Sequence, residues 1–331
     1  MNSKKHRIIT VALIVSGILT VLISLSLGAV WLSPKEIFNA IFSAEDTTAR
    51  RIFFYARLPR TAACLLAGAS LATSGGLIQG ILANRLASPG IIGVNAGAGL
   101  GVTICCALGA IGGWAVAGAS FIGALIAVLT VTFAAQATGA SRSSVILGGV
   151  ALNSFLAAVS EGITTIFPEV GVITADFRAG GFSGVSSERL IPAAIMIVIA
   201  LIFVYSLTNE LDLLSMGEDT AQGLGLSVKK YRTVFLILAA LLAGASVSFA
   251  GLLGFVGLII PNLVRKLVGS ESRKLIPMCT AFGAIFVTLC DCIARTLFTP
   301  HEIPTGIVMS MIGAPFFVFL LFKSKGGHSR G

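Results

Sequence analysis

Charged residues are scarce in this 331-residue sequence. Asp, Glu, Lys and Arg make up 11% of it, whereas a soluble globular domain carries about 25%. Hydrophobic residues make up 56%, and the mean hydropathy is +0.97. A chain with so little polar surface cannot cover a water-facing exterior. The composition therefore excludes a soluble domain and predicts an integral membrane protein.

Catalytic motifs are also missing. The sequence contains no Walker A, H-E-x-x-H or G-x-S-x-G element, so we expect no enzyme, no cofactor bound by this chain, and driving energy from another subunit. The six cysteines lie in apolar runs with no framework of loops for disulfides to hold. Cys290 and Cys292 flank Asp291, but small apolar residues of a membrane helix are the simpler interpretation. We predict no metal site.

The formal net charge of +9 would also suit a nucleic-acid-binding protein. Here, however, the basic residues are not gathered on a polar module. They lie at the ends of apolar runs, where they determine membrane topology. We therefore predict a lipid bilayer as the surroundings and no nucleic-acid partner.

Apolar runs long enough to cross a bilayer recur along the chain. They lie near residues 8–30, 61–82, 91–111, 114–137, 144–167, 190–208, 233–252, 252–264, 275–297 and 305–322. The first run is longer than the roughly 7–15 apolar residues of a signal peptide, so it is expected to be an uncleaved span. The sequence thus predicts an all-α protein, with one membrane domain over residues 1–331 and about ten transmembrane helices.

Loop charge sets the expected orientation. With ten spans and a cytoplasmic N-terminus, most of the 23 Lys and Arg residues fall inside, including every lysine except Lys35. With nine spans, the basic group at 265–274 and the C-terminal tail would both lie outside. Ten spans fit better and place both termini in the cytoplasm. Because the eighth run is short and contains Pro261, a half-span or broken helix is expected there.

Two segments resemble each other internally. Residues 65–81 read LLAGASLATSGGLIQGI, and residues 241–257 read LLAGASVSFAGLLGFVG. The identical pairs are Leu65/Leu241, Leu66/Leu242, Ala67/Ala243, Gly68/Gly244, Ala69/Ala245, Ser70/Ser246, Gly75/Gly251 and Leu77/Leu253. Convergence of two helices rich in small residues is the alternative. If the repeat is genuine, the two segments cross the bilayer in opposite senses, which is an inverted repeat of the kind transporters use.

Four long segments carry a family resemblance. They are RLPRTAACLLAGASLATSGGLIQGILANRLASPGIIGVNAGAGLG at 57–101, LLSMGEDTAQGLGLSV at 213–228, FAGLLGFVGLIIPNLVRKLVG at 249–269, and DCIARTLFTPHEIPTGIVMSMIGAPFFVFLL at 291–321. In this order they resemble the FecCD-type permeases, the membrane subunits of bacterial importers for siderophores, haem and cobalamin. The chain departs from that family's usual sequence at Asn84-Arg85-Leu86-Ala87, where the family usually has Asn-Pro-Leu-Ala, and at Arg178, Gly180 and Gly181, where a Trp and a following Gly-Ser are usual.

This resemblance implies a type II ABC importer permease in the bacterial cytoplasmic (inner) membrane. The implied cargo is a metal chelate, with iron(III)-siderophore the leading candidate and haem or cobalamin the alternatives, moved inward by alternating access. The implied partners are a cytoplasmic ABC ATPase dimer that uses ATP, an extracytoplasmic substrate-binding protein, and a second permease copy or paralogue. An ion-coupled secondary transporter is the alternative from another class, but it would need more intramembrane acids than Asp291.

The cytoplasmic loop 209–232 matches the family's coupling helices. Its glycines predict short helices separated by a glycine turn, and its apolar residues would enter a groove of the ATPase. The residues expected to couple are Gly217, Glu218, Ala221, Leu224 and Gly225. An ordinary solvated connector is the alternative.

Three arginines are predicted outside, against the positive-inside bias. Arg57, Arg60 and Arg295 match family positions that receive acidic residues of the binding protein, since Arg pairs with carboxylates in a bidentate manner. Snorkelling to lipid headgroups is the alternative, as is, for Arg295, an i,i+4 ion pair with Asp291.

The cytoplasmic gate is predicted from position in the resembling family. Asn84 and Leu86 match its gate region, and Ser143 and Ser144 at the inner start of the fifth span are candidates for a second gate element.

Overall fold

In the computed structural model, residues 3–28, 30–43, 47–137, 142–299 and 301–325 are described, and all regular secondary structure in them is helical. The α-helices are α1 (Ser3–Ser26), α2 (Pro34–Phe42), α3 (Thr48–Ile52), α4 (Leu58–Ile81), α5 (Val94–Ala107), α6 (Gly113–Ala137), α7 (Arg142–Ile166), α8 (Pro168–Ala179), α9 (Ser187–Ser206), α10 (Thr208–Ser215), α11 (Glu218–Gly223), α12 (Val228–Ala250), α13 (Val256–Val268), α14 (Ser272–Thr296) and α15 (Thr305–Lys325). A π-helix, η1 (Phe53–Arg57), joins α3 to α4, and a 3-10 helix, η2 (Pro89–Ile92), precedes α5.

Seven helical stretches in the described residues are long and apolar enough to cross a membrane. They are Arg7–Ser26, Thr48–Ile81, Gly113–Ala134, Ser144–Ile166, Ser187–Ser206, Val228–Ala250 and Ser272–Thr296. Shorter apolar helices cover Val94–Ala107 and Thr305–Val318, and α13 has 13 residues. This is the pattern of a multi-pass membrane protein. The total of ten spans stays a prediction.

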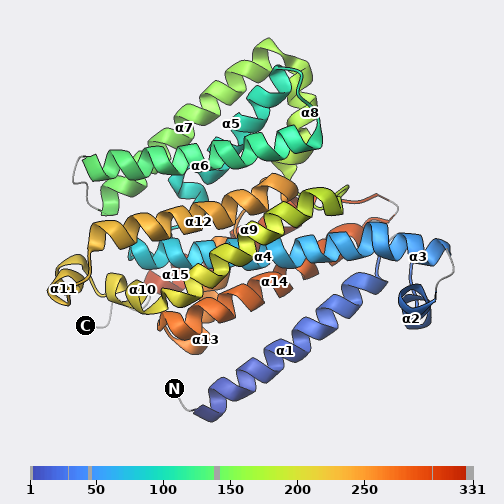
Figure 1. Cartoon of the computed structure of the whole chain (residues 1–331), viewed down its shortest axis with the longest axis horizontal. Helices are drawn as coiled ribbons and strands as arrows, with labels where there is room; N and C mark the ends of the chain where they lie inside the picture. Colours follow the sequence, from blue (N-terminus) through green and yellow to red (C-terminus); the bar gives the residue numbers. More distant parts are fainter. Residues whose placement is uncertain (1–2, 29, 44–46, 138–141, 300, 326–331) are drawn as a thin grey trace.

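Helix α4 forms the centre of the molecule and packs against α12, α13 and α14 (Figure 1). Small residues allow this approach: a Cβ atom added to Gly68 would lie 2.1 Å from the carbonyl oxygen of Gly283, and one added to Gly283 would lie 2.2 Å from that of Gly68. The Ser74 hydroxyl donates to the Ala239 carbonyl at 2.7 Å and ties α4 to α12. Dispersion and close backbone packing, rather than burial from water, hold such helices together in lipid.

The chain unwinds between α12 and α13, over residues 251–255. Gly251 takes a φ of +68°, and a Cβ there would lie 2.5 Å from the Phe177 carbonyl oxygen, so the position requires glycine. The Leu252 N–H donates to the Phe177 carbonyl, and the Gly181 N–H donates to the Ala250 carbonyl. These bonds satisfy backbone groups that lipid would leave unpaired. The chain is thus unwound at the start of the predicted eighth run, 252–264, and α13 is the short helix that follows. Pro261 lies inside α13 and does not interrupt it, so a half-span at this run stays a prediction.

The unwinding also makes the two segments of the predicted repeat differ in structure, because it lies within the second one. Residues 65–81 lie wholly within α4, whereas residues 241–257 run through the end of α12 and the unwound stretch into α13. Their local structures agree only over the first ten positions. The inverted repeat stays a prediction.

Several short helices lie outside the candidate spans. Helix α2 begins with a capping box: the Ser33 hydroxyl accepts from the Glu36 N–H at 3.3 Å, and the Glu36 carboxylate accepts from the Ser33 N–H at 2.8 Å. Hydrogen bonds from Ser33 hold the pKa of the Glu36 carboxyl below its usual value, so this cap stays ionised at neutral pH. The S-x-x-E spacing is visible in the sequence, but the apolar runs alone did not indicate a helix here.

Helices α1 and α7 lie at opposite edges of the molecule (Figure 1), and few residues of their spans are buried. Helices α5 to α8 gather on one side of the central group, with α7 outermost (Figure 1). The start of α1 and the short helices α10 and α11 lie at one end of the molecule, and α2 and α3 lie at the other (Figure 1).

Candidate docking, coupling and gate sites

Arg60, at the start of α4, is fixed by the Asp291 carboxylate from the end of α14. The Arg60 Nε lies 3.2 and 3.1 Å from Oδ1 and Oδ2 of Asp291, and its Nη2 lies 2.9 Å from Oδ1. The Thr305 hydroxyl, at the start of α15, donates to the same Oδ1 at 3.0 Å. The Asp291 side chain is fully buried, so the guanidinium supplies its counter-charge where water cannot.

A second carboxylate reaches Arg60 from the side nearer to solvent. Glu302 Oε2 lies 2.7 Å from the Arg60 Nη1, and the Glu302 side chain is 32% exposed, against 13% for that of Arg60. The Ser183 hydroxyl also donates to Glu302, at 3.4 Å. Arg60 is thus held between a buried and a solvent-accessible acid.

Arg295 and Arg57 lie deeper than the prediction of a docking surface requires. Arg295 is 1% exposed, its Nη2 donates to the Ser24 carbonyl at 2.7 Å, and its Nε lies 3.5 Å from the Asp291 Oδ2. Arg57 is also buried and donates to the Val30 carbonyl at 3.0 Å. The i,i+4 pair of Asp291 and Arg295 is confirmed. Direct contact of Arg57 or Arg295 with a docking protein does not fit this structure, because both side chains are buried.

The coupling loop folds as its glycines predict. Helices α10 and α11 are short, and they are separated by Met216 and Gly217, the latter with a φ of +120°. Gly225 ends the second helix region with a φ of +84°. Glu218, at the start of α11, forms an ion pair with Arg232 on α12 and so anchors α11 to the membrane domain.

The two apolar residues expected to enter the ATPase groove face different ways. Leu224 is 61% exposed, whereas Ala221 is 0% exposed and belongs to the hydrophobic core. The expectation that Ala221 contacts the ATPase is therefore wrong for this structure, because the chain itself covers that side chain. Ala221 packs α11 against the core, and Leu224 is the exposed one of the two.

The predicted gate residues Asn84 and Leu86 lie in the turn after α4. The Asn84 side-chain oxygen accepts from the Leu86 N–H at 2.8 Å, and Ala83 takes a φ of +46°. This local bond offsets the backbone strain of the turn. The Leu86 side chain is exposed, and Asn262 on α13 donates to the Arg85 carbonyl at 2.8 Å, which fixes the turn against α13.

The second predicted gate element is at the start of α7. Ser144 is exposed there, and the side chain of Ser143 lies outside the described residues. A residue that the sequence prediction missed connects α7 to η2, a few residues after the turn that holds Asn84 and Leu86 (the predicted gate turn): Asn153 donates to the carbonyls of Gly90 and Ile91, at 2.8 and 3.1 Å. A lone amide in an apolar run was the available signal.

Arg178, where the resembling family usually has Trp, lies on α8 and donates to the Ser160 hydroxyl at 3.0 Å. Ser160 also contacts the Thr103 hydroxyl at 2.9 Å, so Arg178 joins a polar link between α5 and α7. Gly180 and Gly181 follow in the backbone crossing with residues 250–252. Among the described residues, no group of His, Cys, Asp and Glu is arranged to hold a metal ion.

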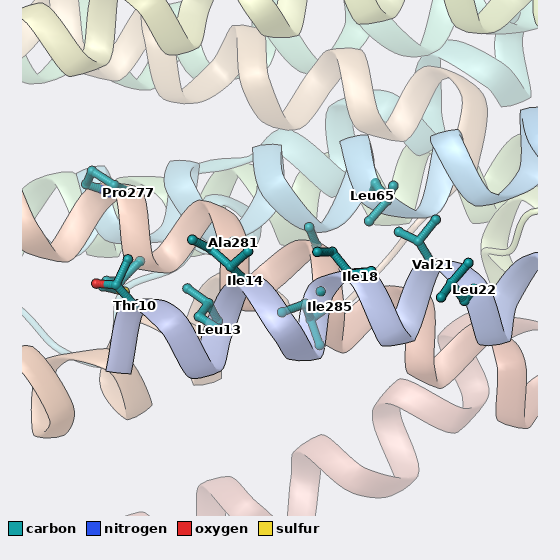
Figure 2. A pocket seen from close by; sticks show the side chains of 13 residues that line it. Thr10, Leu13, Ile14, Ile18, Val21, Leu22, Leu65, Pro277, Ala281 and Ile285 are labelled. Atoms are coloured by element: carbon teal, nitrogen blue, oxygen red, sulfur yellow. The ribbon is translucent and has the colours of Figure 1, made fainter. Parts of the chain in front are cut away.

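A groove of about 570 Å³ runs between α1 and α14, with Leu65 of α4 at its floor (Figure 2). Figure 2 shows Ile14, Ile18 and Val21 of α1 pointing toward it and Ala281 and Ile285 of α14 lining the other wall. Thr10 is its one polar side chain. A groove without convergent polar groups suits hydrocarbon and does not suit a charged or polar cargo.

Comparison with known proteins agrees with this architecture. The family model described as the FecCD transport family matches residues 14–323. The chain is 32% identical to the Fe(3+)-citrate import system permease protein YfmE of Bacillus subtilis, with 96% of each chain covered. It is 35% identical to the iron-uptake system permease protein FeuB of Bacillus subtilis (95% and 94% covered). It is also 35% identical to the vitamin B12 import system permease protein BtuC of Citrobacter koseri (93% and 92% covered).

Among solved structures, the chain resembles an inward-facing conformation of a metal-chelate type ABC transporter. The TM-score is 0.85 at 30% sequence identity, and the match covers 95% of this chain and 99% of the other.

Proposed function

The chain belongs to the FecCD transport family of ABC importer permeases, and we propose that it carries an iron(III) chelate of the siderophore type inward across a bacterial cytoplasmic membrane. The observation that carries the proposal is the likeness, over 95% of the chain, to a metal-chelate type transporter. Two iron-import permeases among the relatives favour iron as the metal. A vitamin B12 import permease is equally similar, so cobalamin is the second candidate.

The proposed orientation has both termini in the cytoplasm. The start of α1 and helices α10 and α11 lie at the same end of the molecule (Figure 1). That end also carries Arg85, Arg265, Lys266 and Arg273. The positive-inside rule supports this end as cytoplasmic.

The proposed site for the cytoplasmic ATPase is the α10–α11 pair. Exposed Leu224 offers an apolar anchor, and the Glu218–Arg232 ion pair links α11 to α12. A movement imposed on α11 would therefore reach a helix that packs directly on α4. ATP hydrolysis in the partner would in this way be converted into the alternating exposure of the cargo path.

The proposed site for the extracytoplasmic binding protein centres on Arg60. Three guanidiniums (Arg57, Arg60 and Arg295) surround two carboxylates (Asp291 and Glu302), which leaves the cluster with one excess positive charge. Glu302 pairs with the Arg60 Nη1, on the side of the guanidinium nearer to solvent. An acidic residue of the binding protein would displace Glu302 and pair with Arg60. The positive charges of the buried Arg57 and Arg295 would attract the same acidic residue without contacting it.

The proposed site for a second permease, an identical copy or a paralogue, is the exposed face of α7. This face carries Ser154, Glu161 and Thr165 as well as large apolar residues. Ionisable residues within spans face protein or water rather than lipid. The cargo path would then run along α7, and the turn that holds Asn84 and Leu86, together with Ser143 and Ser144, would close its cytoplasmic end.

Two measurements test the proposal. The tagged chain, purified gently from its native membrane, should bring with it a P-loop ATPase in stoichiometric amounts, identified by mass spectrometry. Cells lacking the chain should lose uptake of ⁵⁵Fe-labelled siderophore and retain uptake of labelled cobalamin. The reverse pattern of uptake would replace the iron cargo with cobalamin, and a chain that transports while reproducibly purifying alone would overturn the importer assignment.

A further inference from the structure

A small polar pocket of about 220 Å³ opens at the end of the molecule that holds α10, α11 and the start of α1. Its walls come from the end of α4, the gate turn, α10, α13 and the start of α14. Its lining residues are Gly76, Gln79, Gly80, Ala83, Arg85, Leu211, Ser215, Arg265, Ser270, Ser272 and Leu275. The volume is below the roughly 300–1,000 Å³ of ordinary small-molecule sites, so the pocket suits a small group rather than a chelate.

The charged residues that line this pocket are all positive. Arg85 and Arg265 line it, and no acidic residue does. Within the described residues, neither arginine forms an ion pair. Acids on the adjoining elements lie outside the pocket lining: Asp212 accepts from the Ser272 N–H at 2.8 Å, and Glu271 pairs with Lys274. Glu210, also on α10, has a buried Oε2 without a hydrogen-bond partner and does not line the pocket either.

The side chain of the half-buried Arg265 is held in place by hydrogen bonds. Its Nη1 donates to the Gln79 side-chain oxygen at 2.7 Å, and the Gln79 amide nitrogen in turn donates to the Leu258 carbonyl at 3.3 Å. The remaining N–H groups of Arg265 have no acceptor among the described residues. A guanidinium taken partly out of water with donors to spare is stabilised by an anion.

Arg85 is placed on the other wall in a similar way. Its carbonyl accepts from the Asn262 side chain, so the backbone from which its side chain extends is fixed to α13. The guanidinium of Arg265 held by Gln79, the exposed Arg85 side chain on a fixed backbone, and Ser215, Ser270 and Ser272 then line one small space. Planar guanidinium donors and hydroxyls match the oxygens of a phosphate group.

We propose that this pocket binds a phosphate group, either free or in the headgroup of an anionic lipid. Basic pockets between transmembrane helices at the cytoplasmic face bind acidic headgroups. The bound group would connect the gate turn, α10 and α13. The proposal goes beyond the transport assignment and does not depend on the identity of the cargo.

The test uses the full-length chain with its partners in neutral detergent. Binding of ³²P-labelled inorganic phosphate measures the free-anion source, and native mass spectrometry after incubation with phosphatidylglycerol or phosphatidylcholine measures the lipid source. Arg85→Gln removes an exposed cation that lines the pocket. Arg273→Gln is the matched control, because Arg273 is an exposed arginine at the same end that does not line it.

We expect saturable retention of phosphate, of phosphatidylglycerol, or of both, with phosphatidylcholine not retained. Arg85→Gln should weaken that retention about tenfold, equivalent to about 1.4 kcal/mol, while Arg273→Gln should change it less than twofold. Phosphate alone would identify a free anion, and phosphatidylglycerol alone would identify a lipid headgroup. Absence of saturable binding, or equal losses in the two variants, would overturn the proposal, whatever the result for transport.

Discussion

Arg60 and Asp291 form a bidentate ion pair, with Nη2 to Oδ1 at 2.9 Å, across 231 residues of sequence. The pair joins the start of α4 to the end of α14, against which α4 packs through Gly68 and Gly283. The predicted outer end of the molecule is therefore held by charge, and its middle by small residues.

Loss of the buried acid should destabilise the protein. Asp291→Asn removes the counter-charge of both Arg60 and Arg295, and breaking a buried pair costs about 3–5 kcal/mol because a cation is left uncompensated. Thermal unfolding of the purified protein in detergent measures this. Glu302→Gln is the control, since Glu302 is partly exposed and its loss should shift the midpoint far less. Equal shifts would contradict the central role of Asp291.

The same glutamate tests the docking proposal. If Glu302 competes with the binding protein for Arg60, Glu302→Gln should strengthen docking several-fold, and Arg60→Gln should weaken it. Surface plasmon resonance with the purified binding protein at low and high salt measures both, and the difference should shrink as salt screens the charges. Weaker docking in Glu302→Gln would instead indicate that Glu302 itself contacts the partner.

Leu224 should decide ATPase association. Leu224→Asp places a charge on the exposed apolar side chain of the coupling loop, so the ATPase should no longer copurify, while membrane insertion stays normal. Leu224→Met keeps an apolar side chain of similar size and should retain the ATPase. Normal association of the aspartate variant would remove Leu224 from the coupling contact.

Close packing of α4 and α14 should not tolerate a side chain at Gly68. Gly68→Leu pushes against the Gly283 backbone rather than against a movable side chain, so overpacking should cost about 1–3 kcal/mol or more. Gly118→Ala on α6 is the control, because a Cβ there meets nothing within 4 Å. Thermal unfolding should fall only in the Gly68 variant. A similar fall in both would indicate a general intolerance of glycine replacement.

Apolar run length predicts the long helices well, because each span must satisfy its backbone within about 20 residues. Helices α6 and α9 lie close to the expected 114–137 and 190–208. Helix α4 also lies close to the expected 61–82, but the helical stretch that contains it begins earlier, with α3 and the π-helix Phe53–Arg57, where arginines interrupt the apolar run. Helices α2 and α8 were missed, since neither carries a run long enough to span.

The sites were predictable where the signal is local. The i,i+4 spacing of Asp291 and Arg295 and the glycines around α11 both indicated structures that the protein has. The Arg60–Asp291 pair has no local signal, because its partners meet only through tertiary packing. Likewise, Ala221 lies on the six-residue helix α11 and Leu224 directly follows it. Both are apolar, and a pattern this short does not show which of them faces the core.

The most direct test of the importer assignment is cargo uptake by proteoliposomes that contain the complex purified through this chain. With the binding protein and ⁵⁵Fe-siderophore present, uptake should require ATP and should be unaffected by proton or sodium gradients. Uptake driven by an ion gradient without ATP would contradict the assignment and favour a secondary transporter.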